Sequence, residues 1–441
     1  MLWFYIVTII LFFWLCFIIG IRLFYGNFWS QQPVYHYYDF HYIFKSPQII
    51  NREITKNSSF INHKSIESMN LEAFQKHPTY FSHFLWIIQN HYLKNINPKN
   101  PSQDNYYYPK KQNIIPYFIG HHHPSIFSLY TVPTYLNDVK TGTVITDKEI
   151  AGVMTSRPLL ISFSRSHSLL LSKNESERHQ GYDYVCYYVE FLCVKSAFRK
   201  KGIAPQLIAT HEANQRAMTN NKIQISLFKK EEDLTGIVPL CVYTTYGFTV
   251  TNWIKNKPLG LPPQYKIMDI NKHNIHLLND FLKRQRENKE FDVFIIPSIE
   301  NIMELVKTRN IYIKCVFYGN EIISAYFFRK SCVFIEKEKE SITCFASLNG
   351  EKNNGRNRNR NNNISKNNGD YYFIQGFKSS VWSLIRKYKY GFCAIENISH
   401  NTQIVPEIYK KTAATIKSPT AYFFYNFIHP AISSDKVFIL N

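Results

Sequence analysis

An apolar run near the start of the chain predicts a membrane-spanning helix. Residues Leu2 to Ile21 are almost all hydrophobic, and only Thr8 and Gly20 interrupt them. As a helix this run would be about 30 Å long, the thickness of one hydrocarbon core. No charged segment precedes the run and no small-residue cleavage site follows it, which argues against a signal peptide. We therefore expect residues 1–25 to form a single-pass anchor. Arg22 and the very basic remainder of the chain favour a cytosolic location for the rest.

Beyond the anchor, segments with the period of a strand alternate with segments with the period of a helix. Strand patterns cover 150–153, 159–163, 189–194, 311–317, 322–328 and 390–395, and helical patterns cover 274–283, 375–388 and a stretch that begins at 203. Strands and helices alternate in both halves, so we expect an α/β (α+β) fold made of two similar units. The units would be residues 26–253 and 254–441.

One segment of the second unit is too polar to pack. Residues 349–369 consist mostly of Asn, Arg and Lys with a few Gly. Such a composition buries too little apolar surface to offset the entropy that ordering costs. We expect this segment to be a disordered insert between core elements.

The other end of the chain is apolar again. Val437, Phe438, Ile439 and Leu440 precede the last residue, Asn441, and no polar tail follows. Chain ends usually fray, but a strand-like apolar ending predicts a buried one. The α-carboxylate of Asn441 would then enter the interior, where a charge needs a partner.

The net charge restricts the ligands that we expect. The chain has 52 Lys and Arg against 32 Asp and Glu, a formal charge of +20. Nucleic acid, anionic lipid and a polyanionic cofactor such as coenzyme A all suit this charge. The basic residues are scattered, and no zinc-finger, RRM or basic-helix motif is present, so we expect no nucleic-acid partner.

Cysteine and histidine usage suggests neither a disulfide framework nor a metal site. The eight Cys form no C-x-x-C pair, and most lie inside apolar runs, as buried free thiols do. This pattern is typical of a reducing compartment. The consecutive side chains of His121, His122 and His123 do not converge on one ion, so we expect no bound metal.

The segment after residue 188 carries the clearest chemistry. A strand, Val189 to Val194, runs into a basic turn with the pattern Arg199-x-x-Gly202-x-Ala204, and a helix follows. Backbone amides at a helix N-terminus bind phosphate groups well. The turn pattern is common by itself, but here Phe191-Leu192-Cys193-Val194 precedes it and a helix follows. In this context it resembles the acetyl-CoA-binding signature of GNAT enzymes, and the resemblance implies a site for the pyrophosphate of an acyl-CoA.

Three parts of the chain together resemble protein N-myristoyltransferases. They are Phe191-Leu192-Cys193-Val194 with the turn from Arg199 to Pro205, Phe28-Trp29-Ser30-Gln31-Gln32-Pro33-Val34, and the apolar C-terminus. The resemblance covers nearly everything after residue 26. It implies two GNAT-like acyl-CoA N-acyltransferase domains, the first (26–253) for acyl-CoA and the second (254–441) for peptide. It also implies myristoyl-CoA as co-substrate, no tightly bound cofactor, N-terminal glycine peptides or nascent proteins as partners, and a monomer.

The resemblance also assigns roles to residues. The amides of Phe191 and Leu192 would polarise the thioester carbonyl, and the main-chain carboxylate of Asn441 would take the proton of the glycine amine. The residues implied for acyl-CoA binding are Phe28, Trp29, Gln32, Cys193, Val194, Arg199, Lys200, Lys201, Gly202, Ile203 and Ala204.

Several features depart from the family and leave two alternatives open. The family lacks an N-terminal anchor, and its Thr-Ala-Gly appears here as Phe228-Lys229-Lys230. One alternative is a GNAT-type acyltransferase for another amine, such as lysine, with Glu190 as general base. The other is a catalytically silent membrane protein that binds acyl-CoA or lipid.

Overall fold

The computed structural model describes residues 2–24, 26–42, 45–54, 59–95, 105–137, 144–164, 183–231, 236–335, 339–350 and 363–441. The elements before residue 256 are α1 (Leu2–Phe24), α2 (Gly26–Trp29), η1 (Phe40–Tyr42), β1 (Gln48–Ile49), β2 (Ile66–Asn70), α3 (Leu71–Lys76), α4 (Pro78–His91), β3 (Lys94–Asn95), β4 (Asn105–Tyr107), α5 (Lys111–Ile114), η3 (Ile115–Phe118), β5 (Ile126–Asn137), β6 (Val144–Phe163), β7 (Tyr184–Val194), η5 (Ser196–Phe198), α7 (Ile203–Met218), β8 (Ile225–Glu231), β9 (Cys241–Thr249) and α8 (Thr251–Lys255). The later elements are β10 (Tyr265–Asp269), α9 (Ile275–Glu287), β11 (Val293–Ile296), α10 (Ile299–Lys307), β12 (Ile311–Tyr318), β13 (Glu321–Ile335), β14 (Lys339–Asn349), α12 (Asn363–Tyr388), β15 (Phe392–Glu396), α13 (Asn401–Tyr409), β16 (Ile416–Tyr425), β17 (Phe427–Ile428), η6 (Ser434–Lys436) and β18 (Val437–Ile439).

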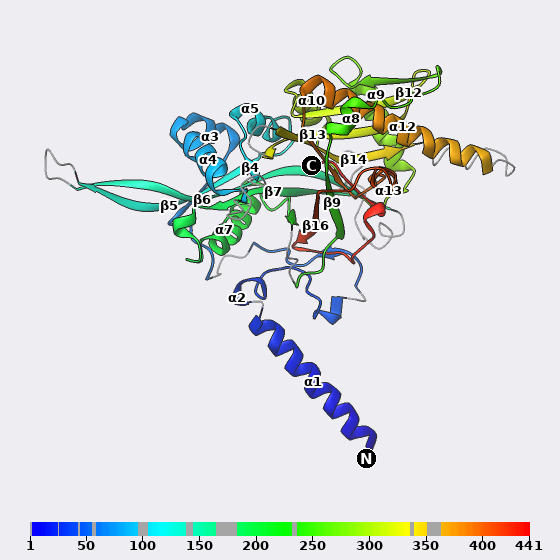
Figure 1. The fold of residues 1–441 in the computed structure, drawn as a ribbon. Helices are drawn as coiled ribbons and strands as arrows, with labels where there is room; N and C mark the ends of the chain where they lie inside the picture. Colours follow the sequence, from blue (N-terminus) through cyan, green and yellow to red (C-terminus); the bar gives the residue numbers. More distant parts are fainter. Residues whose placement is uncertain are drawn as a thin grey trace.

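One large mixed sheet organises the described part of the chain. Its main path has the strand order β10-β12-β13-β14-β15-β9-β16-β8-β7-β6-β11-β18, and helices cover it on both sides (Figure 1). This arrangement confirms the predicted mixed α/β class. The hairpin of β12 and β13 turns at Gly319, whose φ of +59° suits a glycine. The sequence predicted this hairpin and its turn.

The two predicted units share this sheet. β9, from the first unit, lies between β15 and β16 of the second. β16 in turn pairs with β8, and β11 pairs with β6. The predicted boundary at 253/254 therefore does not separate two sheets, because strands from both sides of it interleave in one sheet. This interleaving places residues from both halves around one central region of the sheet.

Helices α4 and α7 cover opposite faces of strands β5 to β7. On the first face Phe84 of α4 packs with Phe127 and Phe191 in the largest hydrophobic core. On the other face Ile203 and Leu207 of α7 pack with residues of β6 and β7 in a smaller core. Successive side chains of a strand point to opposite faces, so both cores draw on the same strands. The central strands are consequently held rigidly from both sides.

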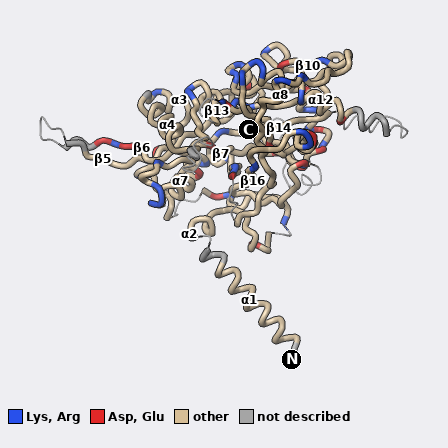
Figure 2. Tube along the Cα trace, viewed as in Figure 1, with Lys and Arg blue, Asp and Glu red and all other residues tan. Residues whose placement is uncertain are grey.

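The predicted anchor is a helix that leaves the body. α1 projects from the underside of the molecule, and its described residues are uncharged along the predicted span (Figure 2). The window Trp3–Gly20 has a mean hydropathy of 2.4, and none of it is buried inside the protein. By length and composition α1 could cross a membrane.

The polar insert is shorter than the sequence suggested. Asn349 ends β14 and is buried, and α12 already begins at Asn363. Residues 351–362, the middle of the predicted insert, lie outside the described part of the chain. The segment 349–369, which we expected to be disordered, therefore overlaps the end of β14 at one side and the start of α12 at the other.

Candidate functional site

The parallel strands β7 and β8 open a V-shaped gap at the centre of the sheet. Cys186 to Val189 pair with Ile225 to Phe228, and these two fully described strands do not pair beyond that point. β7 nevertheless continues to Val194 and β8 to Glu231. The backbone groups beyond Val189 therefore lack the ladder partners that a closed parallel pair would provide.

A β-bulge sits at the mouth of this gap. Across the pairing with β6, Glu190 is opposite Thr155 and Cys193 is opposite Val153, so Phe191 and Leu192 have no partner of their own. Phe191 adopts a φ of +53°, which costs a non-glycine residue roughly 1–3 kcal/mol. Bulges of this kind redirect backbone groups and are frequent beside active sites. The amides of Phe191 and Leu192 are thus turned out of the regular ladder.

The ring of Phe191 and the hydroxyl of Thr155 hold the bulge in place. The Phe191 ring contacts Phe84 and Tyr92, with centroids 5.8 and 5.4 Å away, and only 8 % of the residue is exposed. Thr155 Oγ1 donates to the carbonyl of Glu190 at 2.9 Å. Burial raises the pKa of Tyr92, while the adjacent backbone of Phe191 acts in the opposite direction. The Tyr92 hydroxyl therefore lies close to the bulged backbone.

The basic turn after β7 has the geometry of an anion-binding loop. Gly202 caps α7 with a φ of +75°, and Lys200 is also left-handed at +63°. α7 is 16 residues long, so its N-terminus carries a full helix dipole. Arg199 fixes the turn, since its Nε donates to the carbonyl of Val194 at 3.1 Å and its Nη2 to that of His91 at 2.7 Å. The exposed Lys200 and Lys201 add positive charge.

The segment after the anchor packs against the other arm of the V. The Trp29 ring stacks on Phe228, the last residue of β8 that pairs with β7, at a centroid distance of 6.1 Å. Phe28 meets Trp29 edge-on at 5.0 Å. Gln32 Oε1 accepts a hydrogen bond from the Tyr425 hydroxyl at 2.7 Å. Residues far apart in sequence are thereby brought to the same opening.

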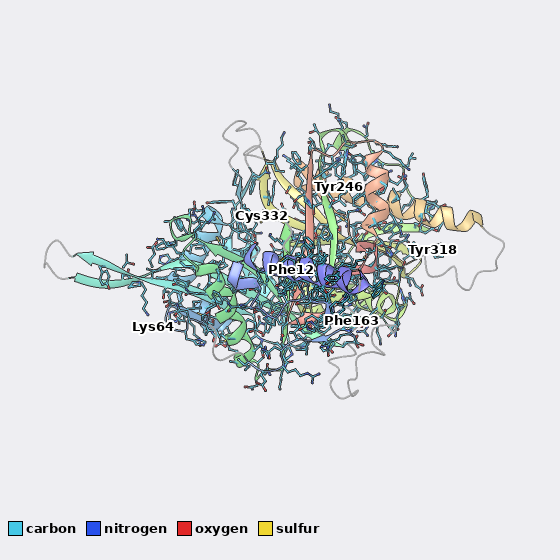
Figure 3. The ribbon with its side chains drawn as sticks, turned by 90° about the horizontal axis from the view of Figure 1, so that it is seen from below. Phe12, Lys64, Phe163, Tyr246, Tyr318 and Cys332 are labelled. Atoms are coloured by element: carbon cyan, nitrogen blue, oxygen red, sulfur yellow. The ribbon has the colours of Figure 1, made fainter. Side chains whose placement is uncertain are left out.

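A cavity of about 940 Å³ lies at this opening, between the strands of the two halves. Glu190 and Phe191 of β7 and Lys229 of β8 line it from one half, and Arg329 of β13 and Glu396 of β15 line it from the other. Aromatic, basic and acidic side chains all contribute to its walls. Figure 3 labels Cys332, another residue of the cavity wall, on the same strand as Arg329.

Glu396 is the centre of a buried charge cluster in this cavity. Its Oε1 accepts from Lys229 Nζ at 3.1 Å and from Arg329 Nη2 at 3.3 Å, and its Oε2 accepts from the Tyr243 hydroxyl at 2.6 Å. Burial raises the pKa of Glu396, but Lys229 and Arg329 together with the Tyr243 hydrogen bond outweigh it and leave the pKa below its ordinary value. Lys229 belongs to the segment that departs from the family's Thr-Ala-Gly pattern. Its positive charge is therefore neutralised by the ionised carboxylate of Glu396.

A second buried pair involves Glu190. Arg157 Nε lies 3.2 Å from Glu190 Oε2, and the Arg157 side chain is fully buried between the rings of Tyr117 and Tyr188. Its Nη1 and Nη2 have no hydrogen-bond partner among the described residues. Because an unpaired buried guanidinium is costly, the contact with Glu190 is needed in the folded protein. One oxygen of Glu190 is thus occupied by Arg157.

The last residues of the chain lie beside the first cluster. β18 pairs in parallel with β11, and Leu440 N donates to the carbonyl of Ile295 at 2.8 Å. Leu440 and Asn441 are buried, and Arg329 Nη2 donates to Asn441 Oδ1 at 3.4 Å. The same Nη2 contacts Glu396, a residue of the cavity wall. Figure 1 shows this end of the chain near the centre of the molecule.

Of the residues that the sequence singled out, Phe191 and Arg199 line the cavity, Trp29 packs on Phe228, and Asn441 contacts the cavity residue Arg329. Ile203 is buried, and Cys193 and Val194 have buried side chains, so only their backbone can face a ligand. Burial raises the pKa of the Cys193 thiol to about 12, which makes it unreactive. Sequence reasoning missed Arg157, Arg329 and Glu396. Their only sequence signal is a charged residue within or directly after an apolar strand.

The splayed strands, the bulge and the capped helix α7 all belong to one mixed α/β fold. No family model matches the chain, and no curated protein matches it in sequence. Among solved structures, N-myristoyltransferase of Saccharomyces cerevisiae with bound myristoyl-CoA matches with a TM-score of 0.65, 13% identity and 94% coverage of both chains. A further structure of that enzyme with bound myristoyl-CoA matches at a TM-score of 0.63 and 12% identity, over 92% of this chain and 94% of that one. A third, with myristoyl-CoA and inhibitors, also gives 0.63, at 13% identity and 93% coverage of both chains. The expected resemblance to N-myristoyltransferases is thus confirmed for the fold.

Proposed function

We propose that this protein is a membrane-anchored acyl-CoA N-acyltransferase that moves myristate from myristoyl-CoA to the N-terminal glycine of peptides or nascent proteins. The observation that carries the proposal is the bulge at Phe191 and Leu192, placed at the mouth of the V between β7 and β8. The fold is like that of yeast N-myristoyltransferases, whose structures contain myristoyl-CoA. The cavity provides room for an acceptor on the same side of the thioester.

The donor would lie along the V. Amides at the start of α7 and the charges of Lys200 and Lys201 suit the CoA pyrophosphate. Phe28, Trp29 and Gln32 would border the acyl-CoA beside Phe228. Arg199 would act indirectly, because its guanidinium already bonds two backbone carbonyls and so fixes the shape of the turn.

The reaction needs an oxyanion hole and a deprotonated amine. The amides of Phe191 and Leu192 would stabilise the oxyanion that forms when the amine nitrogen attacks the thioester carbon. A C–N bond forms and the C–S bond breaks, with CoA leaving as a thiolate that needs no strong acid. The proton lost by the amine would pass to the main-chain carboxylate of Asn441.

The terminal carboxylate is plausible as a base only in a buried setting. An exposed α-carboxyl has a pKa of about 3.3–3.7 and an α-amine one of about 7.7–8.0, a poor match. Burial disfavours both charged forms and narrows this difference. Asn441 is 4 % exposed, which supports this role. Arg329, which bonds both the Asn441 side chain and Glu396, would position the terminus without touching the substrate.

The rival base, Glu190, is less suited to accept a proton. Its Oε2 already pairs with Arg157, whose other nitrogens have no partner among the described residues, so protonating Glu190 would leave a buried cation unpaired. Acylation of another amine, such as lysine, through Glu190 is for this reason the second candidate. A silent acyl-CoA-binding or lipid-binding protein is the third.

One assay separates these possibilities. Radiolabelled myristoyl-CoA would be offered with peptides that begin with glycine and with an N-blocked peptide that contains lysine. The proposal predicts label only on the glycine peptides, and label on the blocked lysine peptide would favour the Glu190 mechanism. Saturable binding of myristoyl-CoA with no transfer to any peptide would refute the enzymatic function and leave a binding protein.

A further inference from the structure

The anchor helix touches the body of the protein halfway along its length. Trp14 of α1 has its ring centroid 5.5 Å from that of Phe40, a residue of η1. Both rings are still largely open, with Trp14 44 % and Phe40 41 % exposed. Seen from below, α1 with its labelled Phe12 lies in front of the body, from which it projects in Figure 1 (Figure 3). The segment around Phe40 therefore lies next to the middle of the apolar helix.

This contact fixes the level of Phe40 relative to a membrane. A helix rises 1.5 Å per residue, so Trp14 lies about 15 Å along the axis from Phe24, the last residue of α1. The hydrocarbon core is about 30 Å thick, and half of it is about the same distance. If α1 crosses a bilayer, the Phe40 ring, which contacts Trp14, lies at the depth of the hydrocarbon core and is surrounded by lipid instead of water.

The segment that carries Phe40 is built to present rings outward. His36 is buried; its Nε2 meets the carbonyl of Trp29 at 3.1 Å and its Nδ1 meets Asp39 at 3.1 Å. Its ring also stacks on Tyr38 at 4.7 Å. These contacts tie the segment to the body, while Tyr37, between them in sequence, is 60 % exposed. Tyr37 and Phe40 are thus held outward by a fixed backbone.

We propose that Tyr37 and Phe40 insert into the membrane leaflet from which α1 emerges, as a second contact between the protein and the lipid bilayer. Moving an exposed aromatic ring from water into lipid is favourable because it removes apolar surface from water. The continuity with the unburied apolar helix identifies lipid as the occupant of this surface. The inference rests on the proposed membrane anchoring. It adds that the body has one fixed orientation on the bilayer, since η1 and α1 both hold it.

This orientation places the donor site close to the membrane. The carbonyl of Trp29 accepts a hydrogen bond from His36 Nε2, and the Trp29 ring stacks on Phe228 at the mouth of the V. Only seven positions separate Trp29 from His36. The lipid-contacting residues would thus be joined by a short, fixed segment of chain to the opening where acyl-CoA is proposed to bind.

The test measures the depth of single positions in the full-length protein, reconstituted in phosphatidylcholine vesicles with or without doxyl-labelled lipid. Cys16 is exposed on α1, and the other seven cysteines are buried. Native Cys16, labelled with the fluorophore NBD, gives the reference for a position in lipid. In a Cys16→Ser background, Tyr37→Cys and Phe40→Cys are labelled in the same way. Tyr318→Cys is the matched control, because Tyr318 is 54 % exposed at the tip of the β12–β13 hairpin, away from α1 (Figure 1).

We expect NBD at positions 37 and 40 to be quenched by doxyl lipid and shielded from aqueous iodide, as at Cys16, while position 318 shows the reverse. Quenching at Cys16 together with water-like behaviour at 37 and 40 would overturn the second contact but keep the anchor. No quenching at Cys16 would instead refute the membrane anchoring on which the inference rests. An unchanged thermal unfolding midpoint in each labelled variant excludes misfolding as the cause.

Discussion

Replacing Glu396 by Gln should destabilise the protein strongly, because it removes the buried anion that the partly buried Lys229 and Arg329 share. Lys229 and Arg329 lie 3.1 and 3.3 Å from the Glu396 carboxylate, and Glu396 is 2 % exposed. Gln has nearly the same shape, so no cavity forms and the loss is electrostatic. Removing one partner of a buried pair costs about 3–5 kcal/mol. Urea unfolding of the two proteins measures this difference directly.

The same reasoning predicts a partial rescue. In a protein that carries both Glu396→Gln and Lys229→Met, one of the two cations that lost the Glu396 carboxylate is also gone. The double variant should be less destabilised than the sum of the single ones, by roughly 0.5–3 kcal/mol. The cluster also lines the cavity, so the transfer activity should fall in the Glu396→Gln variant. In the double variant the stability should be restored more than the activity.

A matched control uses a carboxylate at the surface. Glu407 pairs with Lys410 on α13 and its side chain is 41 % exposed, so Glu407→Gln should change stability by at most about 1 kcal/mol. If Glu396→Gln is as stable as this control, the cluster does not carry the energy assigned to it. The pH dependence gives a second check. Because the folded pKa of Glu396 is lowered, its contribution is complete above the ordinary value of 4.5 and is lost as the pH falls below it.

Four further predictions follow from the structure. Adding one Gly after Asn441 would move the carboxylate by about 3.5 Å and should lower the single-turnover transfer rate roughly a hundredfold; full activity would refute the carboxylate mechanism. Alanine at both Lys200 and Lys201 should weaken binding of CoA more than that of myristate in calorimetry, since only CoA carries phosphates, and equal losses would indicate damage to the fold. A chain that begins at Gly26 should still bind myristoyl-CoA, because α1 contributes nothing buried to the body; loss of binding would place the domain boundary elsewhere. Burial lowers the pKa of His211 from 6.5 to about 3. The unfolded chain therefore binds the extra proton, and this residue should lower stability by about 1.4 kcal/mol per pH unit as the pH drops below 6.5; a stable His211→Gln variant should show a slope smaller by that amount.

Local patterns were enough to find the elements of the proposed acyl-CoA site. The strand before residue 194, the left-handed Gly202 and the helix after it are all encoded within a short stretch of sequence. Strands, glycine turns and helices depend mainly on residues that are close in sequence, so they can be predicted without knowledge of the rest of the fold. The anchor helix and the hairpin at Gly319 were predictable for the same reason.

Patterns failed where distant residues satisfy polar groups. Two separate strands were predicted at 150–153 and 159–163, but β6 is one strand from Val144 to Phe163. The polar residues between the two patterns are buried against partners elsewhere: Thr155 bonds Glu190, and Arg157 pairs with the same residue. The break in hydrophobic alternation therefore marked buried polar contacts with Glu190 of β7 and not the end of a strand.

The sequence by itself determined the class of fold, the apolar helix at Leu2–Ile21 and the glycine-containing turn before α7, because each depends on the period or the backbone conformation of neighbouring residues. Only the tertiary structure decided which charged residues surround the cavity. Lys229, Arg329, Glu396 and Asn441 come from β8, β13, β15 and the end of the chain, and they meet because strands of both halves interleave in one sheet. A charged residue in an apolar strand destabilises the fold unless an opposite charge pairs with it, and that partner can be far away in sequence.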